Sequence, residues 1–395
     1  MTADWYDLAQ RLYAARTRAV VARLAAAPIP RVSNPVAVRA RQLRAGVTVT
    51  AAAPGRAEAT ARDGEALSLL HDLGVRVTAG SWRTLVTADA ATLPALAALA
   101  RSADRAGPQA DTAAHLAWWA DRADFPGSSA VVPLTACCQA RWVTGTGPAA
   151  ENRLGTWLAW LAVPGSGCPA MIALLDRVQA GVPLALLEWI ERADADSWAA
   201  ARRGHDGGRD WRQPDSVGQA ATGLRARCDL SDMYAAALLT DPLFRRRAVH
   251  TGHVVTGTAA SVPGSKNTVT VTCDRADARL RAGDEITGWA GRPAGSPSPA
   301  DRFGGTITGT GISAGTLTLT ITGTRAGSTP AGTRVTICPA APDPQRQQLG
   351  RTRLRSLYGT RTSWLTTGRH PAVSRRDVPL DIVVAAAGAG GDAGG

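Results

Sequence analysis

The chain has 395 residues, of which 45% are hydrophobic, so two or three domains with sizeable cores are expected. Its formal net charge is +12, and Lys266 is the only lysine, so arginine supplies almost all of the positive charge. No stretch approaches the roughly 18 charge-free apolar residues of a membrane-spanning helix, which excludes that class.

The choice of arginine over lysine is typical of a GC-rich bacterial genome, but the net charge needs a separate account. Residues 1–60 carry nine arginines and three acids, and residues 341–381 carry eight arginines and three acids. The two segments therefore hold +11 of the +12. Basic flanks on a neutral body are what contact with a polyanion requires, whereas the alternative is a pair of solvated segments that keep the chain soluble.

The first 110 residues predict a mixed α/β region. Residues 3–27 have the spacing of one amphipathic helix, with Trp5, Leu8 and Leu12 on its apolar side. A strand is expected near Val47–Thr50, followed by a short helix in DGEALSLLHDLG that Gly74 closes. The segment VRVTAGSWRTLVTAD predicts two short strands, and TADAATLPALAALARSADRAG predicts a helix.

Residues 111–244 predict a Trp-rich helical domain. The segments AAHLAWWADRAD, ENRLGTWLAWLAV and VPLALLEWIERADADSWAAARRG each carry apolar residues at helical spacing. Tryptophan at such spacing usually lies in a core, so these rings are expected to pack inside the domain. The loop at 204–216 separates the last two helices.

Residues 245–340 predict a small antiparallel β-barrel. TLTLTITGT alternates Leu or Ile with Thr, which is the pattern of a half-buried strand. Five further segments alternate in the same way between turns rich in Gly, Pro, Ser and Asp: HVVTGTA, NTVTVTCD, DEITGW, GTITGT and TRVTICP. LRAGDEITGW and PAGTRVTI resemble the turns of barrels inserted in translation factors and some helicases.

Residues 341–395 predict a basic extension with a disordered Gly/Ala tail. QRQQLGRTRLRSLYG predicts a short basic helix, and the residues after it are expected to be extended. The predicted fold class is therefore α+β, with mixed and mostly helical N-terminal two-thirds, a small antiparallel β-barrel and the basic extension.

No motif in the chain indicates a reaction. The phosphate-loop pattern is absent, and the six cysteines show neither a CxxC pair nor zinc-type spacing. His250 and His253 form the only close histidine pair, with no further ligand nearby. The loop GHDGGRDWRQPD, with His205, Asp206, Asp210 and Asp215, has the densest set of polar groups and would hold the site if the protein were an enzyme. We predict no catalytic residue, metal or cofactor.

The basic elements favour a non-enzymatic, nucleic-acid-associated protein that binds DNA or RNA. Arginines would grip phosphates, and Tyr358 and Trp364 would stack on bases. The predicted contacts are Arg245, Arg246, Arg247, Arg351, Arg353, Arg355, Tyr358, Arg361, Trp364, Arg369, Arg375 and Arg376.

Two other functions stay open. The Thr/Gly-rich strands also suit a structural or assembly component of a phage-like or other multiprotein particle, and the 204–216 loop leaves an enzyme possible. Partner proteins are therefore possible, and a membrane is not expected. The N-terminus MTADWYDLAQ lacks the apolar run of a signal peptide, and the cysteines are scattered, so a cytoplasmic location is expected.

Overall fold

The computed structural model describes residues 5–78, 80–213, 215–295 and 297–359. These residues divide into two compact units. The larger unit contains residues 5–213 and 227–344, and the smaller contains residues 215–226 and 345–359. None of the described helices combines the length and apolarity that crossing a membrane requires.

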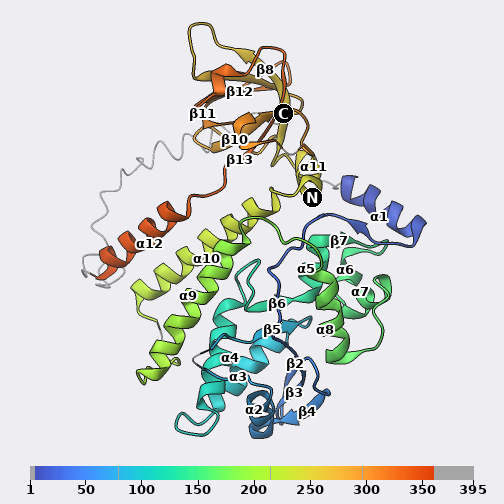
Figure 1. The fold of residues 1–395 in the computed structure, drawn as a ribbon, viewed down its shortest axis with the longest axis vertical. Helices are drawn as coiled ribbons and strands as arrows, with labels where there is room; N and C mark the ends of the chain where they lie inside the picture. The colour runs from blue at the N-terminus through green and yellow to red at the C-terminus, as the bar shows by residue number, and fades with distance from the viewer. Residues whose placement is uncertain (1–4, 79, 214, 296, 360–395) are drawn as a thin grey trace, which may run out of the picture. The chain divides into compact units, whose positions relative to one another are not determined.

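A five-stranded mixed sheet organises the first part of the larger unit (Figure 1). Strand β2 pairs antiparallel with β3 and parallel with β5, while β4 and β6 form the two edges. In order across the sheet, the strands are β4 (Ala59–Arg62), β3 (Gly46–Ala52), β2 (Pro35–Leu43), β5 (Thr84–Thr87) and β6 (Val131–Pro133).

Helices cover both faces of this sheet, because β2 buries side chains on both. Val36, Val38 and Ala40 pack with α2 (Asp63–Asp72), α3 (Thr92–Ser102) and α4 (Ala110–Arg122). Ala37 of the same strand lies in a second core on the opposite face. The helices of that core are α5 (Leu134–Arg141), α7 (Leu154–Trp160) and α8 (Gly167–Val178).

Short elements complete this part of the chain. Strands β1 (Val21–Ala22) and β7 (Trp142–Val143) pair antiparallel, and α6 (Pro148–Glu151) precedes α7. Helix α2 ends before Gly74, whose φ of +84° is the left-handed conformation that favours glycine. The predicted helix end at Gly74 is therefore confirmed.

Helix α9 (Leu187–Asp206) is joined to the sheet region by a buried ionic network. Asp194 is fully buried, and its carboxylate accepts hydrogen bonds from the Arg122 guanidinium. It also accepts hydrogen bonds from the Ser128 hydroxyl, at 3.0 and 3.1 Å, and from the Ser129 hydroxyl, at 3.1 Å. The Ser129 backbone N–H adds a bond of 2.8 Å. Because every partner of this carboxylate comes from α4 or from the turn before β6, the network fixes α9 against both.

Helix α1 (Trp5–Thr17) packs through its polar side rather than its apolar side. Arg11 donates to Asp7 at 2.7 Å and to the buried Glu151 at 2.9 Å, and Arg23 also pairs with Asp7. Trp5 and Leu12 are 74% and 63% exposed. The predicted helix over 3–27 is too long, because Arg18 has a φ of +52° and ends it.

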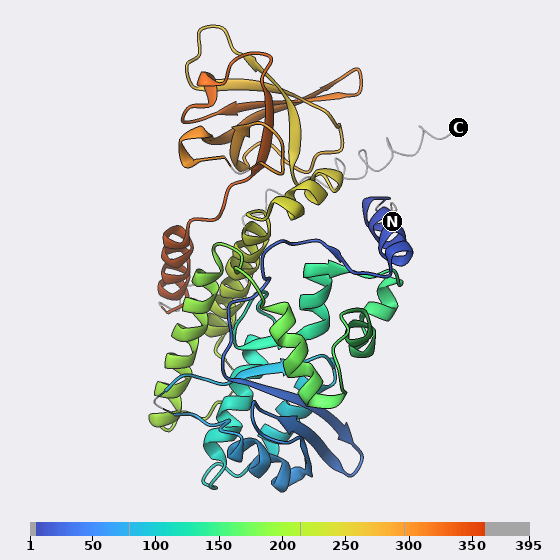
Figure 2. The ribbon, with the colours of Figure 1, turned by 45° about the vertical axis from the view of Figure 1, so that its right-hand side comes forward.

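The C-terminal strands of the larger unit close into a six-stranded ring, which Figure 2 shows. Two helices, α10 (Val217–Leu238) and α11 (Pro242–His250), precede it. In order around the ring, the strands are β10 (Glu285–Ala290), β11 (Arg302–Ser313), β12 (Thr316–Thr322), β9 (Thr268–Cys273), β8 (Val255–Ser261) and β13 (Arg334–Pro339).

Each of the six segments predicted as strands in this region is a strand. In β12, Leu317, Leu319 and Ile321 are buried while the threonines between them are not. The same alternation in β9 places Val269 and Val271 in the core. The ring therefore encloses a core made of its own strands and the loops between them.

The predicted fold class is nevertheless wrong as a whole. The structure is α+β, with helices spread along the described chain instead of concentrated before a small barrel, and its C-terminal strands form a six-stranded ring. The N-terminal region holds a five-stranded sheet that takes β6 from beyond residue 110. Helix α12 (Pro344–Gly359) is described, whereas residues 360–395 of the predicted extension lie outside the described residues.

Candidate anion-binding sites

Arg245, the first predicted phosphate contact, is an internal structural residue. Its side chain is buried on α11 and donates four hydrogen bonds to backbone carbonyls. Those of Leu239 and Thr240 precede α11, whereas those of Pro293 and Gly295 follow β10, at distances of 2.6–3.0 Å. Its guanidinium also lies 5.3 Å from the Trp289 ring centroid, so no face of it is open to a phosphate.

The other two arginines of α11 differ in exposure. Arg246 is exposed, while Arg247 is half-buried with its Nη2 4.0 Å from Asp7 Oδ1. On α12, Arg353 and Arg355 are exposed and Arg351 is half-buried. The backbone of Tyr358 belongs to α12, but its side chain is not described.

The remaining predicted contacts lie outside the described residues. These are Arg361, Trp364, Arg369, Arg375 and Arg376. Among the predicted contacts in the described residues, the structure therefore places Arg245, Arg246 and Arg247 on α11, and Arg351, Arg353, Arg355 and the backbone of Tyr358 on α12.

The other polar candidates are engaged in local contacts. His250 stacks on Tyr6 at 4.6 Å between ring centroids, and His253 lies 3.0 Å from Thr251 Oγ1 and 3.3 Å from Arg279 Nη1. Burial and the charge of Arg279 lower the pKa of His253. Asp210 pairs with Arg105 at 2.6 Å. Among the described residues, no three His, Cys, Asp or Glu side chains gather as metal ligands would.

One face of the β2–β3–β4 sheet presents a group of arginines that sequence reasoning did not single out. Arg41 lies opposite Thr48, which lies opposite Arg62, so these side chains share a face across three strands. Arg39 lies two residues before Arg41 and therefore points to that face as well. All three arginines are exposed, and we call them the arginine face.

The arginine face combines cations with hydroxyl groups. Its rows bring Thr48, Thr50 and Thr60 beside the arginines, and Arg62 Nε donates to Thr48 Oγ1 at 3.3 Å. Two strand spacings separate Arg41 from Arg62 by about 10 Å at the backbone. Of the nearby acids, Asp89 is 3.9 Å from Arg41, and Glu58 accepts a hydrogen bond from Cys168 at the start of α8. Among the described residues, Arg41 is therefore the one member of the face with a carboxylate within ion-pair distance.

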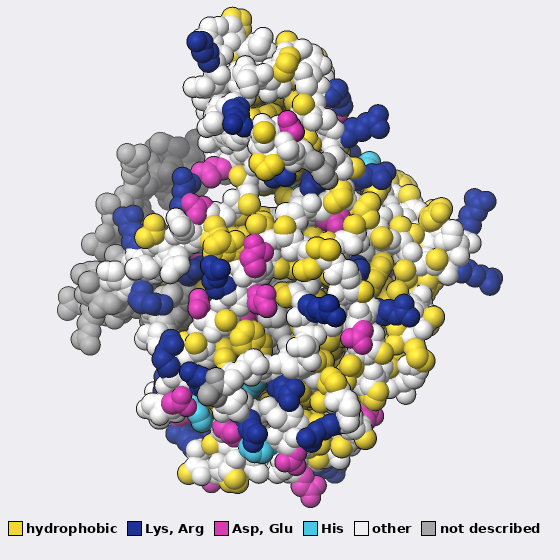
Figure 3. Space-filling model, viewed as in Figure 1, with side chains coloured by type: hydrophobic (Ala, Val, Ile, Leu, Met, Phe, Trp, Pro, Cys, Tyr) yellow, Lys and Arg dark blue, Asp and Glu magenta, His cyan; other side chains and the backbone are white. Residues whose placement is uncertain are grey.

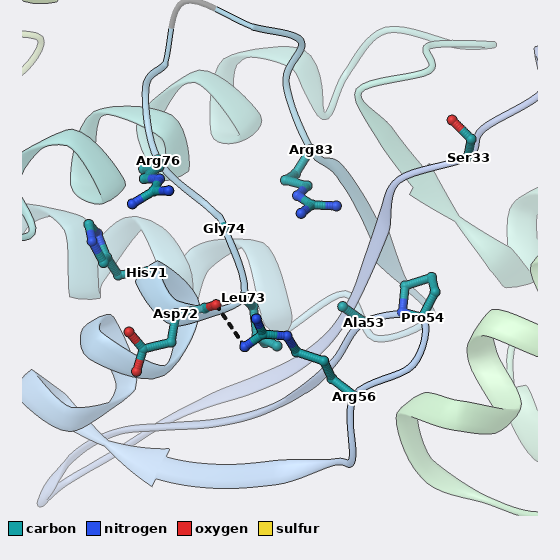
Figure 4. Close-up of a pocket in the computed structure, with 10 residues that line it drawn as sticks. All are labelled: Ser33, Ala53, Pro54, Arg56, His71, Asp72, Leu73, Gly74, Arg76 and Arg83. Carbon is teal, nitrogen blue, oxygen red and sulfur yellow. Dashed lines mark hydrogen bonds between the residues drawn. The ribbon is translucent and has the colours of Figure 1, made fainter.

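A second group of arginines lines a pocket at the opposite end of β3 (Figure 4). Arg56 follows β3, Arg76 follows α2, and Arg83 directly precedes β5. The pocket has a volume of about 450 Å³, and we call it the arginine pocket. Its other lining residues are Ser33, Ala53, Pro54, His71, Asp72, Leu73 and Gly74.

The tryptophan-rich helices hold the backbone that carries two of these arginines. Trp119 Nε1 donates to the Arg83 carbonyl at 2.9 Å, and Trp198 Nε1 donates to the Gly80 carbonyl at 3.3 Å. His115 Nδ1 donates to the Arg76 carbonyl at 3.3 Å. The prediction that these rings lie in the core is confirmed for Trp118, Trp119 and Trp198, and the structure adds this positioning role.

His115 is fully buried among these rings. Trp119 and Trp198 lie within 4.8 Å and 4.6 Å of it, between ring centroids. Burial lowers its pKa to about 4, the charge of Arg83 contributes, and hydrogen bonds to the carbonyls of Arg76 and Arg83 oppose the shift. The side chain is therefore a neutral imidazole at pH 7.

Neither arginine group has a signal within a short stretch of sequence. The arginine face depends on strand register, and the arginine pocket joins three segments between residues 56 and 83. The high arginine content of residues 1–60 covers Arg39, Arg41 and Arg56, but no pattern in the sequence points to Arg62, Arg76 or Arg83. Comparisons of the chain with protein-family models, with curated proteins and with solved structures found no match.

Proposed function

We propose that the protein is a non-enzymatic nucleic-acid-associated protein whose phosphate contacts come from the arginine face. The observation that carries the proposal is the strand register, which places Arg39, Arg41 and Arg62 on one exposed surface with threonine hydroxyls between them. Arginine and threonine side chains are common phosphate ligands in protein–nucleic-acid contacts. Spacings of about 7 and 10 Å allow them to follow a backbone rather than grip one ion.

Helix α12 supports the same proposal. It contains no acidic residue and four arginines, Arg346, Arg351, Arg353 and Arg355. Of these, Arg353 and Arg355 are exposed. The proposal therefore retains the predicted contacts on α12 and Arg246, but it omits Arg245, whose donors serve the chain's own carbonyls. We also propose that the protein is cytoplasmic, because its six cysteines are free thiols and such thiols fit a reducing compartment.

The arginine face carries no aromatic side chain, which determines the expected kind of binding. Without base stacking or groove-reading groups on it, contact with this face should be independent of sequence and sensitive to salt. Each lost phosphate contact should reduce the slope of log K against log salt by roughly one.

The test is a binding titration of fluorescent single-stranded and duplex oligonucleotides between roughly 50 and 200 mM salt. We expect binding by the wild-type chain, with a shallower salt slope for the R39Q/R41Q/R62Q variant. Arg177→Gln is the matched control, because Arg177 is exposed at the end of α8. Absence of binding at the lowest salt, or equal slopes for the triple variant and the wild type, would contradict the proposal.

A further inference from the structure

We infer that the arginine pocket is a binding site for a phosphomonoester, separate from the arginine face. Arg56, Arg76 and Arg83 reach it from three different segments, and Figure 4 shows their guanidinium groups arranged around the Leu73–Gly74 backbone. A cavity of about 450 Å³ is within the range of small-molecule sites, roughly 300–1,000 Å³.

The positive charge of the pocket is largely uncompensated. Within the described residues, no carboxylate forms an ion pair with Arg56, Arg76 or Arg83. Arg56 Nη1 instead donates to the backbone carbonyl of Asp72 at 3.0 Å, and Figure 4 shows the Asp72 carboxylate directed away from that guanidinium. His71, which precedes Asp72 in the chain, is held by two residues of α4. Its Nδ1 lies 3.0 Å from Thr112 Oγ1 and 3.5 Å from Asp111 Oδ1.

The backbone around the pocket is fixed before any ligand arrives. Trp119 and His115 hold the carbonyls of Arg83 and Arg76, which orients both residues without using their side chains. Gly74 adds room, since a Cβ at this position would lie 2.9 Å from Arg83 Nη2. The guanidinium of Arg83 therefore lies directly against the glycine, a placement that any other residue at position 74 would disturb. A fixed backbone removes part of the entropy cost of ordering these residues around a ligand.

The chemistry favours phosphate over a single carboxylate. A phosphomonoester carries up to two negative charges and three terminal oxygens, which match several planar guanidinium forks. Few apolar side chains line the pocket, namely those of Ala53, Pro54 and Leu73, so the rest of the ligand should be polar. Inorganic phosphate, a sugar phosphate and the 5′-phosphate end of an oligonucleotide share this chemistry.

The experiment measures binding to the full-length protein by calorimetry and by thermal shift, with inorganic phosphate, ribose 5-phosphate and succinate as probes. We expect saturable binding of the two phosphates and weaker or no binding of succinate. Arg76→Gln and Arg83→Gln should each weaken phosphate binding about tenfold or more. Arg56 lies in an exposed loop, so Arg56→Gln should not disturb folding. This variant gives the same test if either of the other two fails to fold.

Controls separate this site from the proposed nucleic-acid function. Arg153→Gln, at an exposed arginine, and the R39Q/R41Q/R62Q variant should both bind phosphate as the wild type does. A further comparison uses one oligonucleotide with and without a 5′-phosphate. If the phosphorylated form binds more tightly, and this difference is lost in Arg83→Gln, the natural ligand of the pocket is the end of a nucleic-acid strand. No phosphate binding, binding unchanged in all three pocket variants, or preference for succinate would overturn the inference.

Discussion

Single side chains in this protein take roles that their residue type alone does not reveal. Arg245 would be expected on a surface, yet it binds four backbone carbonyls, whereas Arg39 and Arg41 are exposed in the middle of a strand. The sequence identifies where arginines are frequent, but burial and partners decide which can meet a ligand. A side chain with five donors in a planar fork serves either purpose equally well.

The pH dependence of stability should reveal His115. Its pKa is about 4 in the folded protein against about 6.5 when unfolded, so the unfolded chain binds more protons between these values. Stability should therefore be unaffected by this residue above pH 6.5 and should fall by roughly 3 kcal/mol as the pH drops to 4. Urea denaturation at several pH values measures this loss.

A variant isolates the contribution of that imidazole. His115→Phe should be less stable at pH 7, because the hydrogen bond to Arg76 is lost, but its stability should depend less on pH between 4 and 6.5. His205→Gln should retain the wild-type dependence. An equally steep dependence in His115→Phe would show that other groups cause it.

At the scale of elements, the period-two segments were predictable and the buried parallel strands were not. Strands β8, β9 and β12 of the ring alternate because one face of each meets a core and the other does not, whereas β13 is buried at four consecutive positions. Strands β5 (TLVT) and β6 (VVP) are too short to show a period, and β5 is buried at every position. Of the two strands predicted in VRVTAGSWRTLVTAD, the described residues form only the second, β5.

Helix α1 shows why an apolar stripe does not determine which side of a helix is buried. Its spacing predicts that Trp5, Leu8 and Leu12 face the core, but the ion pairs of Asp7 and Arg11 occupy the inner side. Burial raises the pKa of Glu151, but hydrogen bonds from Arg11 and Thr144 outweigh burial and leave it below its usual range. The carboxylate is therefore charged and depends on its partner.

Substitutions at two adjacent residues should change stability by very different amounts. Arg11→Met removes the cation beside a carboxylate that is 1% exposed, so we expect a loss of about 3 kcal/mol. Leu12→Gln replaces an exposed side chain and should change stability by no more than about 0.5 kcal/mol. Urea denaturation of both variants at pH 7 measures these changes in the free energy of unfolding. A larger loss for Leu12→Gln than for Arg11→Met would mean that the apolar side of α1 is the side packed against the protein.

At the scale of the whole molecule, the two groups of arginines could not be predicted because they depend on long-range pairing. The arginine face requires the register of three strands, and the arginine pocket requires helices α4 and α9 to position the backbone before β5. The predicted domain limits at 110, 244 and 340 stay a prediction. The ring offers the clearest way to examine one of them.

A fragment of residues 242–340 should fold alone. The core of the ring consists of residues from Val255 to Ile337, so the fragment retains all of it. Trp289 is the only tryptophan in this range and is 5% exposed, with its Nε1 donating to the Arg292 carbonyl at 3.3 Å. We expect buried-type fluorescence and one cooperative transition. Solvent-exposed emission without a transition would show that the ring needs the rest of the chain.

The closure of the ring also limits how this region can meet other proteins. Its strands are hydrogen-bonded to two neighbours where the ring closes, but residues 309–313 of β11 lie beyond the last pair with β10, at Thr306, and pair with β12 alone. Strand addition, the route by which many extended peptides attach to sheets and by which sheets seed fibrils, is therefore closed to the strands where both sides are paired, and an extended peptide would add at the free side of residues 309–313. Where both sides are paired, a partner must contact side chains and turns.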